Sequence, residues 1–242
     1  MKQYHYLGQS ALLLSLLLTG AESAQNQGVT VRFKPVFNGV PLQLEQRSYT
    51  TAQGEAVVIT ACRLYVSGLQ LQYRDGSTYH EPTSYHLLDA EADSTWTIRL
   101  PLAPNQPLTA LAFSVGVDSL ANVTGAHTGA LDPARGMYWA WHSGYVNAKL
   151  EGRSPQAGSP RREFEFHVGG YAAPASTLRR VRLPVAGSAA GPLLVLADVG
   201  AWLRGVRLVT TYSVLTPGPA AQALADGYAR MFRLTPGAAA RP

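Results

Sequence analysis

The chain has 242 residues, 46% of them hydrophobic, and a formal net charge of +5 from 20 Lys and Arg against 15 Asp and Glu. That length can bury a core, and the arginines are too scattered for a nucleic-acid footprint, with short local clusters only in 161–162 and 179–182. The single cysteine, Cys62, excludes an intramolecular disulfide, so packing alone must hold the fold.

The amino terminus has the pattern of a secretory signal peptide over residues 1–23. Lys2 precedes an apolar stretch at 11–18, and Ala21-Glu22-Ser23 offers small residues where a signal peptidase cleaves. The apolar stretch is too short to anchor the chain across a bilayer. We therefore expect residues 24–242 to form a single mature domain in a periplasm or outside the cell.

Strand patterns recur along the rest of the chain. Alternating or apolar runs, bounded by Gly, Pro, Asn and Asp, occur at 29–33, 57–73, 84–89, 95–100, 108–117, 137–150, 163–168, 179–183 and 193–199. A helix is expected over 219–232, where Leu224, Tyr228 and Met231 recur at helical spacing. The pattern predicts an all-β fold, an antiparallel β-sandwich or related barrel with a short C-terminal helix.

Two tryptophans distinguish the predicted strand 137–150. Because side chains alternate along a strand, Trp139 and Trp141 share one face with Met137, whereas His142 lies on the other. Two indoles about 7 Å apart on one face suit either core packing or a redox-active site. The pattern alone leaves both interpretations open.

Histidine is the residue type with the most potential for chemistry in the mature chain. None of its five positions belongs to a compact metal-binding pattern, and they are His80, His86, His127, His142 and His167. A metal site would therefore have to be assembled from separate strands and loops. Cys62 lies in a near-continuous strand pattern that is typical of a buried small hydrophobe, although a thiolate would suit copper.

Other chemistries fit the sequence poorly. Ser143 adjoins His142, but neighbours on a strand point to opposite faces and no G-x-S-x-G elbow occurs, which disfavours a hydrolase. The acidic run 89–93 lacks the glycine and distal glutamate of an EF-hand, so a solvated turn is the better interpretation. We expect that the protein is not an enzyme.

Six segments, in order from about residue 29 to 200, resemble the MbnP family of secreted copper proteins, which are relatives of MopE and CorA. They are 31–39 (VRFKPVFNG), 64–71 (LYVSGLQL), 85–89 (YHLLD), 116–118 (GVD), 129–152 with its W-x-W motif, and 166–171 (FHVGGY). Such proteins bind Cu(I) through histidines and a kynurenine, which a MauG-like di-haem partner of the cytochrome c peroxidase type makes from the first tryptophan of the motif. The resemblance implies that Trp139 is the residue to be oxidised.

The resemblance also implies a ligand set. Oxidation opens the indole and leaves an amine and carbonyls that can coordinate, and Cu(I) accepts imidazole nitrogen at low coordination number. His142 is discounted because it opposes Trp139 on the predicted strand, and Trp141 is expected to pack beside the site or to pass oxidising equivalents to it. The expected metal-binding residues are Trp139, His86, His127 and His167.

The resulting hypothesis is a periplasmic or extracellular copper(I)-binding protein of copper homeostasis or transport, which is a substrate of a haem enzyme rather than a catalyst. Two alternatives stay open at this point. One is a secreted β-sandwich module for binding or adhesion, in which the tryptophans pack or stack on a ligand without a metal. The other is a copper enzyme, which is disfavoured because no acid–base pair is visible.

Overall fold

Strands make up most of the folded chain. The computed structural model describes residues 28–101, 107–141, 144–186 and 191–235, so the expected signal peptide and His142 lie outside these ranges. The strands are β1 (Gly28–Phe37), β2 (Val40–Pro41), β3 (Ser48–Thr50), β4 (Ala56–Tyr73), β5 (Thr78–His80), β6 (Tyr85–Asp89), β7 (Thr97–Pro101), β8 (Leu108–Val115), β9 (Tyr138–Trp139), β10 (Gly144–Arg153), β11 (Glu163–Gly169), β12 (Arg179–Pro184), β13 (Leu193–Asp198), β14 (Ser213–Val214) and β15 (Phe232–Leu234). The helices are α1 (Ser119–Val123), α2 (Val199–Trp202) and α3 (Pro219–Ala229), with short 3₁₀ turns η1 (Asp93–Trp96), η2 (Gly129–Leu131) and η3 (Pro133–Arg135).

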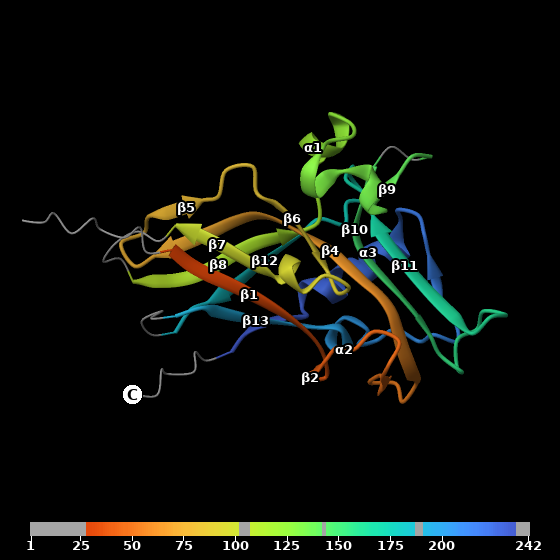
Figure 1. Ribbon diagram of the computed structural model, residues 1–242. Coiled ribbons are helices and arrows are strands. Elements are labelled where there is room, and N and C mark those ends of the chain that lie inside the picture. The colour runs from red at the N-terminus through yellow and green to blue at the C-terminus, as the bar shows by residue number, and fades with distance from the viewer. Residues whose placement is uncertain (1–27, 102–106, 142–143, 187–190, 236–242) are drawn as a thin grey trace, which may run out of the picture.

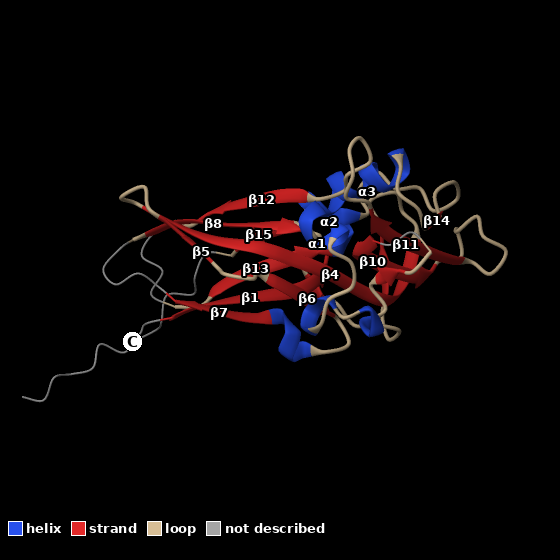
Figure 2. Cartoon of the chain, turned by 90° about the horizontal axis from the view of Figure 1, so that it is seen from above, coloured by secondary structure: helices blue, strands red, loops and turns tan. Residues whose placement is uncertain are grey.

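Two curled sheets pack face to face (Figure 1 and Figure 2). In the described residues one sheet has the order β15-β13-β1-β2, with β7 also paired to β1, and the other has the order β12-β8-β4-β10-β11-β14. The short strands β3, β5 and β6 pair with β4, and β9 pairs with β10. The predicted all-β sandwich with a short C-terminal helix is confirmed. The β1–β13 and β11–β14 pairs are parallel, a detail that alternation does not indicate.

The long strand β4 organises the larger sheet. It pairs with β10 through its first half and with β8 through its second half, while β6 pairs along its other edge. The register with β8 shifts between Ser67 and Gln70, and Gly68 in between has a φ of +57°. A residue without a Cβ tolerates that backbone, which lets the strand bend at an irregularity and continue into its second half.

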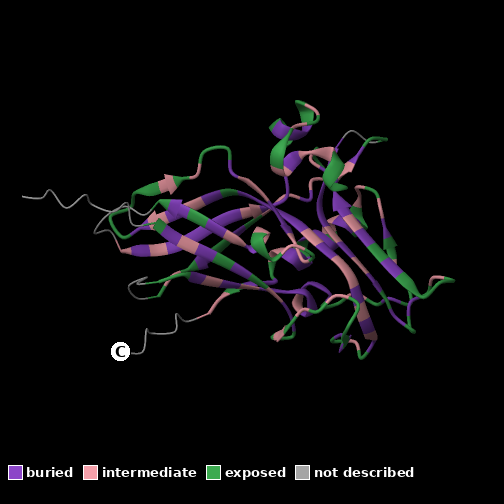
Figure 3. Ribbon diagram, in the orientation of Figure 1, coloured by how far each residue is buried: buried purple, intermediate pink, exposed green. Residues whose placement is uncertain are grey.

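The main hydrophobic core fills the space between the sheets, and the buried residues follow their facing sides (Figure 3). Three phenylalanines join the layers: the Phe113 ring on β8 lies 5.5 Å from Phe33 on β1 and 5.1 Å from Phe232 on β15, both edge to face. Fully burying each such ring contributes about 1.5–3 kcal/mol relative to leaving it exposed.

The C-terminal helix is shorter than its sequence pattern indicates. The apolar spacing predicts a helix to residue 232, but α3 ends at Ala229 because Phe232 enters β15 and pairs with Ala197. The helix packs on α2, where the Trp202 ring lies 5.7 Å from the buried Tyr228. None of the helices in the described ranges is long and apolar enough to cross a membrane.

The predicted strand 137–150 is wrong in one respect, because it is a hairpin. β9 contains only Tyr138 and Trp139, Ala140 and Trp141 form a turn, and β10 begins at Gly144, which pairs with Trp139. The Ser143-Gly144 dipeptide has the composition of a turn, which the apolar pattern around it conceals. Strand alternation therefore stops at Trp139 and cannot place His142, which lies outside the described residues.

Candidate functional site

A second, smaller hydrophobic cluster lies on the outer face of the larger sheet. On β4, Leu64 and Val66 belong to the main core, so Tyr65 between them points to the opposite side. We call this group the outer cluster, and its buried members are Tyr65, Leu87, Val117, Ala121, Leu131, Met137, Trp139, Tyr145 and Val146. The segment 117–137, which carries α1, η2 and η3, supplies four of these residues and covers the sheet here.

Hydrogen bonds from Asn122 and Tyr145 hold this covering segment on the sheet. The Asn122 Oδ1 accepts the backbone N–H of Tyr145 at 2.8 Å, while its Nδ2 donates to the carbonyls of Val117 at 3.1 Å and Asp118 at 2.8 Å. The Tyr145 hydroxyl donates to the Leu131 carbonyl at 2.9 Å. Because these groups are buried or half-buried, losing either side chain would leave backbone polar groups unpaired.

Trp139 is nearly buried at the edge of the outer cluster, with 7% of its surface exposed. Its six-membered ring lies directly over Gly169 of β11, since a Cβ at that position would stand 2.6 Å from Trp139 Cζ3. Trp141, in the turn, is 64% exposed, and its ring centroid lies 5.5 Å from that of Trp139 at an interplanar angle of 43°. The two indoles are therefore in contact, one inside and one at the surface.

His167 lies on the same face of the sheet as the Trp139 ring. It precedes Gly169 by two residues on β11, so both positions face outward, about 7 Å apart, while Phe164 and Phe166 are buried in the main core. His167 Nε2 is 2.7 Å from Glu151 Oε1, which also binds Lys149 Nζ at 3.1 Å.

The carboxylate beside His167 is held in its charged form. Burial raises the pKa of Glu151, but hydrogen bonds from His167 and Lys149 outweigh that effect and keep the pKa below its usual range. A carboxylate partner of this kind fixes the orientation of an imidazole ring and makes its other nitrogen a better donor toward a metal. The pair thus presents a histidine prepared for ligation on the Trp139 face.

His127 belongs to the covering segment. Its ring Nε2 lies 3.0 Å from the Ala121 carbonyl and 3.0 Å from Thr124 Oγ1, and its backbone N–H donates to the Tyr145 hydroxyl at 3.2 Å. The side chain therefore satisfies a carbonyl at the C-terminal end of α1, which the helix itself leaves unpaired. These contacts give His127 a structural role, because they fix the end of α1 and join the covering segment to Tyr145.

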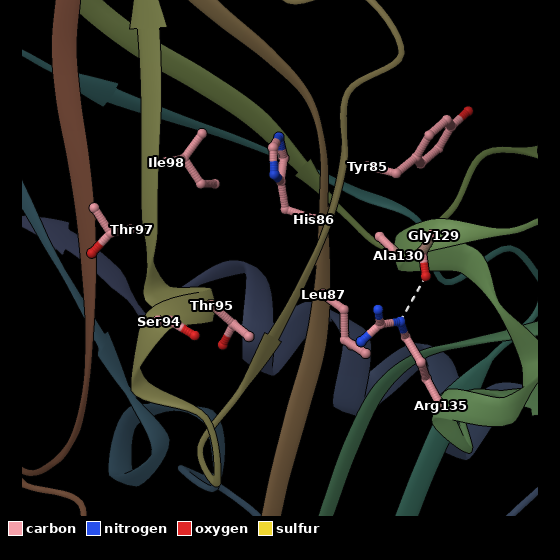
Figure 4. Close-up of a pocket in the computed structure, with 10 residues that line it drawn as sticks. All are labelled: Tyr85, His86, Leu87, Ser94, Thr95, Thr97, Ile98, Gly129, Ala130 and Arg135. Carbon is pink, nitrogen blue, oxygen red and sulfur yellow. Dashed lines mark hydrogen bonds between the residues drawn. The ribbon is translucent and has the colours of Figure 1, made fainter.

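His86 lies on the other side of β6 from the outer cluster. Tyr65 pairs with Leu87 and both belong to that cluster, so the preceding His86 points away from it. Figure 4 shows the His86 and Leu87 side chains on opposite sides of the strand, with His86 directed toward Ile98. His86 Nε2 lies 2.8 Å from Glu81 Oε2 and lines a pocket of about 320 Å³.

The structure thus brings only part of the predicted ligand set together. His167 shares a face with Trp139, His127 lies in the segment that covers the same cluster, and His86 points away from the cluster into a pocket that the covering segment also lines. Within the described ranges, no group of three or more His, Cys, Asp or Glu side chains could hold a metal ion. Cys62 faces the main core, and its burial raises the pKa of the thiol to about 12, which disfavours the thiolate that copper would need.

Comparison with known families agrees with this architecture. The sequence model of the MbnP family matches residues 26–217, most of the chain. The chain belongs to the MbnP family. A solved structure, MbnP from Methylosinus trichosporium, is similar in fold, with a TM-score of 0.54 and 21% sequence identity over 80% of this chain and 83% of that chain. Comparison with curated proteins finds no match.

Two residues of this MbnP-family site escape the sequence patterns. Gly169 makes room for the Trp139 ring, and its only sequence signal is the Gly169-Gly170 pair at the end of a strand. Glu151 orients His167, and alternation along β10 puts it on the same face as Lys149, but nothing local indicates that β11 pairs beside it. Both roles depend on the pairing of strands, not on a motif.

The MbnP-family chain also exposes large apolar side chains on α1 and in the hairpin turn. The large hydrophobic residues that are exposed in the described ranges are Leu120, Val123, Trp141 and Val209. Three of these lie in α1 and in the hairpin turn, and Asn122 of α1 bonds to β10 of that hairpin. Apolar surface of this kind is typical of interaction sites.

Proposed function

We propose that this protein is secreted and binds Cu(I), with Trp139 oxidised to kynurenine as part of the binding site. Membership of the MbnP family supports a role in copper biology. The observation that carries the finer proposal is the placement of Trp139, a nearly buried indole on the same sheet face as the carboxylate-bound His167. Copper is the cargo, and the protein serves copper homeostasis or transport in a periplasm or outside the cell.

The chemistry explains why an oxidised tryptophan is needed. Indole offers no free lone pair, and the described residues hold no cluster of three ordinary ligands. Dioxygen and water convert the side chain into kynurenine, which carries an aniline-type amine and a ketone, and the lost carbon leaves as formate. Dioxygen is the net oxidant, and a di-haem enzyme starts the reaction by removing one electron that is returned in a later step, so this protein is its substrate rather than a catalyst.

The resulting donors suit Cu(I). Because this ion accepts imidazole nitrogen at low coordination number, His167 and a modified Trp139 need little further support. Glu151 keeps the His167 ring oriented, and the outer cluster keeps the Trp139 side chain in a fixed, dry position. The backbone of His127 contacts Tyr145, but its imidazole ring already binds the Ala121 carbonyl of α1. The ring could therefore bind copper only if the covering segment moved.

The test compares the wild-type protein with Trp139→Phe, both secreted by a host that makes the di-haem partner. The variant is expected to fold with a loss of about 1–2 kcal/mol of stability, since a smaller aromatic ring keeps most of the packing. It is expected to carry no tightly bound copper. Thermal unfolding and copper content per chain give both results, with the exposed His80→Ala as the matched control.

Two outcomes would contradict the proposal. Full copper content in Trp139→Phe would favour a site made only of unmodified side chains. Absence of copper from every protein, wild type included, would favour the secreted binding module.

A further inference from the structure

We propose that Trp141 is the residue through which electrons leave Trp139 while Trp139 is oxidised. The inference rests on the proposed function, because it assumes that Trp139 is modified by a protein oxidant. Its basis is the unequal exposure of two indoles in contact, with Trp139 7% exposed and Trp141 64% exposed.

A protein-sized oxidant cannot reach the Trp139 ring directly. That ring lies over Gly169 at the edge of the outer cluster, and only 7% of the residue is exposed. The Trp141 ring lies at the surface with its centroid 5.5 Å from that of Trp139. Electron transfer between two such rings is fast because their π-systems nearly touch. The exposed ring therefore provides an electron-transfer path from the buried ring to the partner.

The electron balance leaves Trp141 unchanged. Trp141 loses one electron to the haem oxidant of the partner, which is reduced by one electron, and then regains one from Trp139. The Trp139 radical cation releases its indole proton and adds dioxygen to form a peroxyl radical, which takes back one electron from the reduced haem through Trp141, together with one proton. The resulting hydroperoxide rearranges to N-formylkynurenine, and water then releases formate and leaves kynurenine. Trp141 therefore acts as a relay and is not consumed.

The two buried tyrosines of the outer cluster, Tyr65 and Tyr145, do not compete for the oxidation. Tyr145 and Tyr65 are in edge-to-face contact at 5.9 Å, and their hydroxyls donate to the backbone carbonyls of Leu131 and Ala130. Oxidation of a phenol requires loss of its proton, which a carbonyl does not accept. Burial also raises the pKa of both hydroxyls, so neither of these phenols is readily oxidised by the indole radical.

The surface around Trp141 suits a docked protein oxidant. Leu120 and Val123 of α1 are both largely exposed, and Asn122 between them bonds to the N–H of Tyr145 at the start of β10. A partner that docks on the hairpin turn would bury Trp141, and one that extends to α1 would also bury Leu120 and Val123, which favours association. The same contact would place its oxidant against the relay ring.

The first experiment co-expresses the di-haem partner with full-length Trp141→Phe, Trp141→Tyr and the control Tyr138→Phe. Phenylalanine fills a similar space but is very hard to oxidise, whereas tyrosine keeps a redox-active ring. Peptide mass spectrometry is expected to show loss of Trp139 modification in Trp141→Phe, partial recovery in Trp141→Tyr and full modification in Tyr138→Phe. Thermal unfolding checks that all three variants fold.

The outcomes separate the relay from the proposed function. Modification of Trp139 in Trp141→Phe at the wild-type level would overturn the relay and leave the proposed function standing. Equal loss in Trp141→Tyr, or loss in Tyr138→Phe, would also overturn it, because disturbance of the hairpin would then explain the result. Absence of modification in the wild type would overturn both.

A second experiment removes the partner and uses a bulky photochemical oxidant, ruthenium(III) tris-bipyridine, in the presence of oxygen. Trp96 and Trp202 are internal references, since they are 4% and 1% exposed, close to the value for Trp139. In wild-type protein, oxidation of Trp139 is expected to exceed that of both references. In Trp141→Phe it is expected to fall to their level, and an unchanged excess would contradict the relay.

Discussion

Gly169 decides where the Trp139 ring can lie. A Cβ there would stand 2.6 Å from Trp139 Cζ3 and 2.7 Å from the Tyr145 carbonyl oxygen, distances at which something must move. The carbonyl belongs to the backbone of β10 and cannot yield easily, so a methyl group at this position would strain the pairing of β10 with β11 and also displace the indole. One hydrogen atom in place of a methyl group therefore sets the geometry of the candidate site.

Gly169→Ala is accordingly expected to cost about 1–3 kcal/mol of stability, the usual penalty for overpacking a tight contact. It is also expected to raise the exposure of Trp139, visible as a red shift of tryptophan fluorescence relative to the wild type. Gly191→Ala serves as the control, because a Cβ there meets no atom within 4 Å. Equal stability of the two variants would contradict the assigned contact.

Glu151 gives the site a pH dependence. Its pKa is lowered in the folded protein, so its ionised form favours folding above the ordinary Glu range, near pH 4.3 in model peptides. That contribution is lost as the pH falls through the lowered folded pKa. Glu151→Gln is therefore expected to lose up to about 1 kcal/mol near neutral pH, and little at a pH below both values.

Denaturant unfolding at the two pH values measures this difference. The matched control is Glu163→Gln, whose exposed partner Arg161 lies 3.4 Å away and is expected to contribute almost nothing. If Glu151→Gln were equally destabilising at both pH values, packing rather than charge would explain the effect.

At the scale of elements, the orientation of each strand decides whether its histidine points toward Trp139 or away from it. The β4–β6 register puts Tyr65 beside Leu87, which turns His86 away from the outer cluster, whereas β11 turns His167 toward the Trp139 side. In the copper proposal, His167→Ala is expected to weaken Cu(I) binding severely and His86→Ala only slightly. Competition with a Cu(I) chelator, using protein with modified Trp139, measures both, and greater loss from His86→Ala would reject the face argument.

The sequence patterns predicted the elements better than their partners. Alternation located β1, β4, β6, β8 and β11–β13 closely, because a strand with one buried side leaves a local signal. The turn that begins at Ala140 lies inside an apolar run, so the pattern predicts one strand where the structure has a hairpin. Whether His86 and His167 lie on the Trp139 side of the sheet depends on the register between strands that are distant in sequence, for which no local pattern exists.

At the scale of the whole molecule, the fold separates stability from the candidate chemistry. The main core lies between the sheets, whereas Trp139 lies in the outer cluster on the other face of the larger sheet, and Trp141 contacts it from the surface. Changes to the covering segment can therefore alter the site while the sandwich remains intact. The signal peptide over 1–23 and the single domain over 24–242 stay predictions.

The most direct test of the account is the mass of the peptide that contains Trp139, taken from protein secreted by its native host. With the di-haem partner present, we expect Trp139 to have exchanged one carbon for one oxygen, and Trp141 to be unmodified. Protein made without the partner is expected to keep both indoles. Unmodified Trp139 in native material, with the partner expressed, would contradict the central claim.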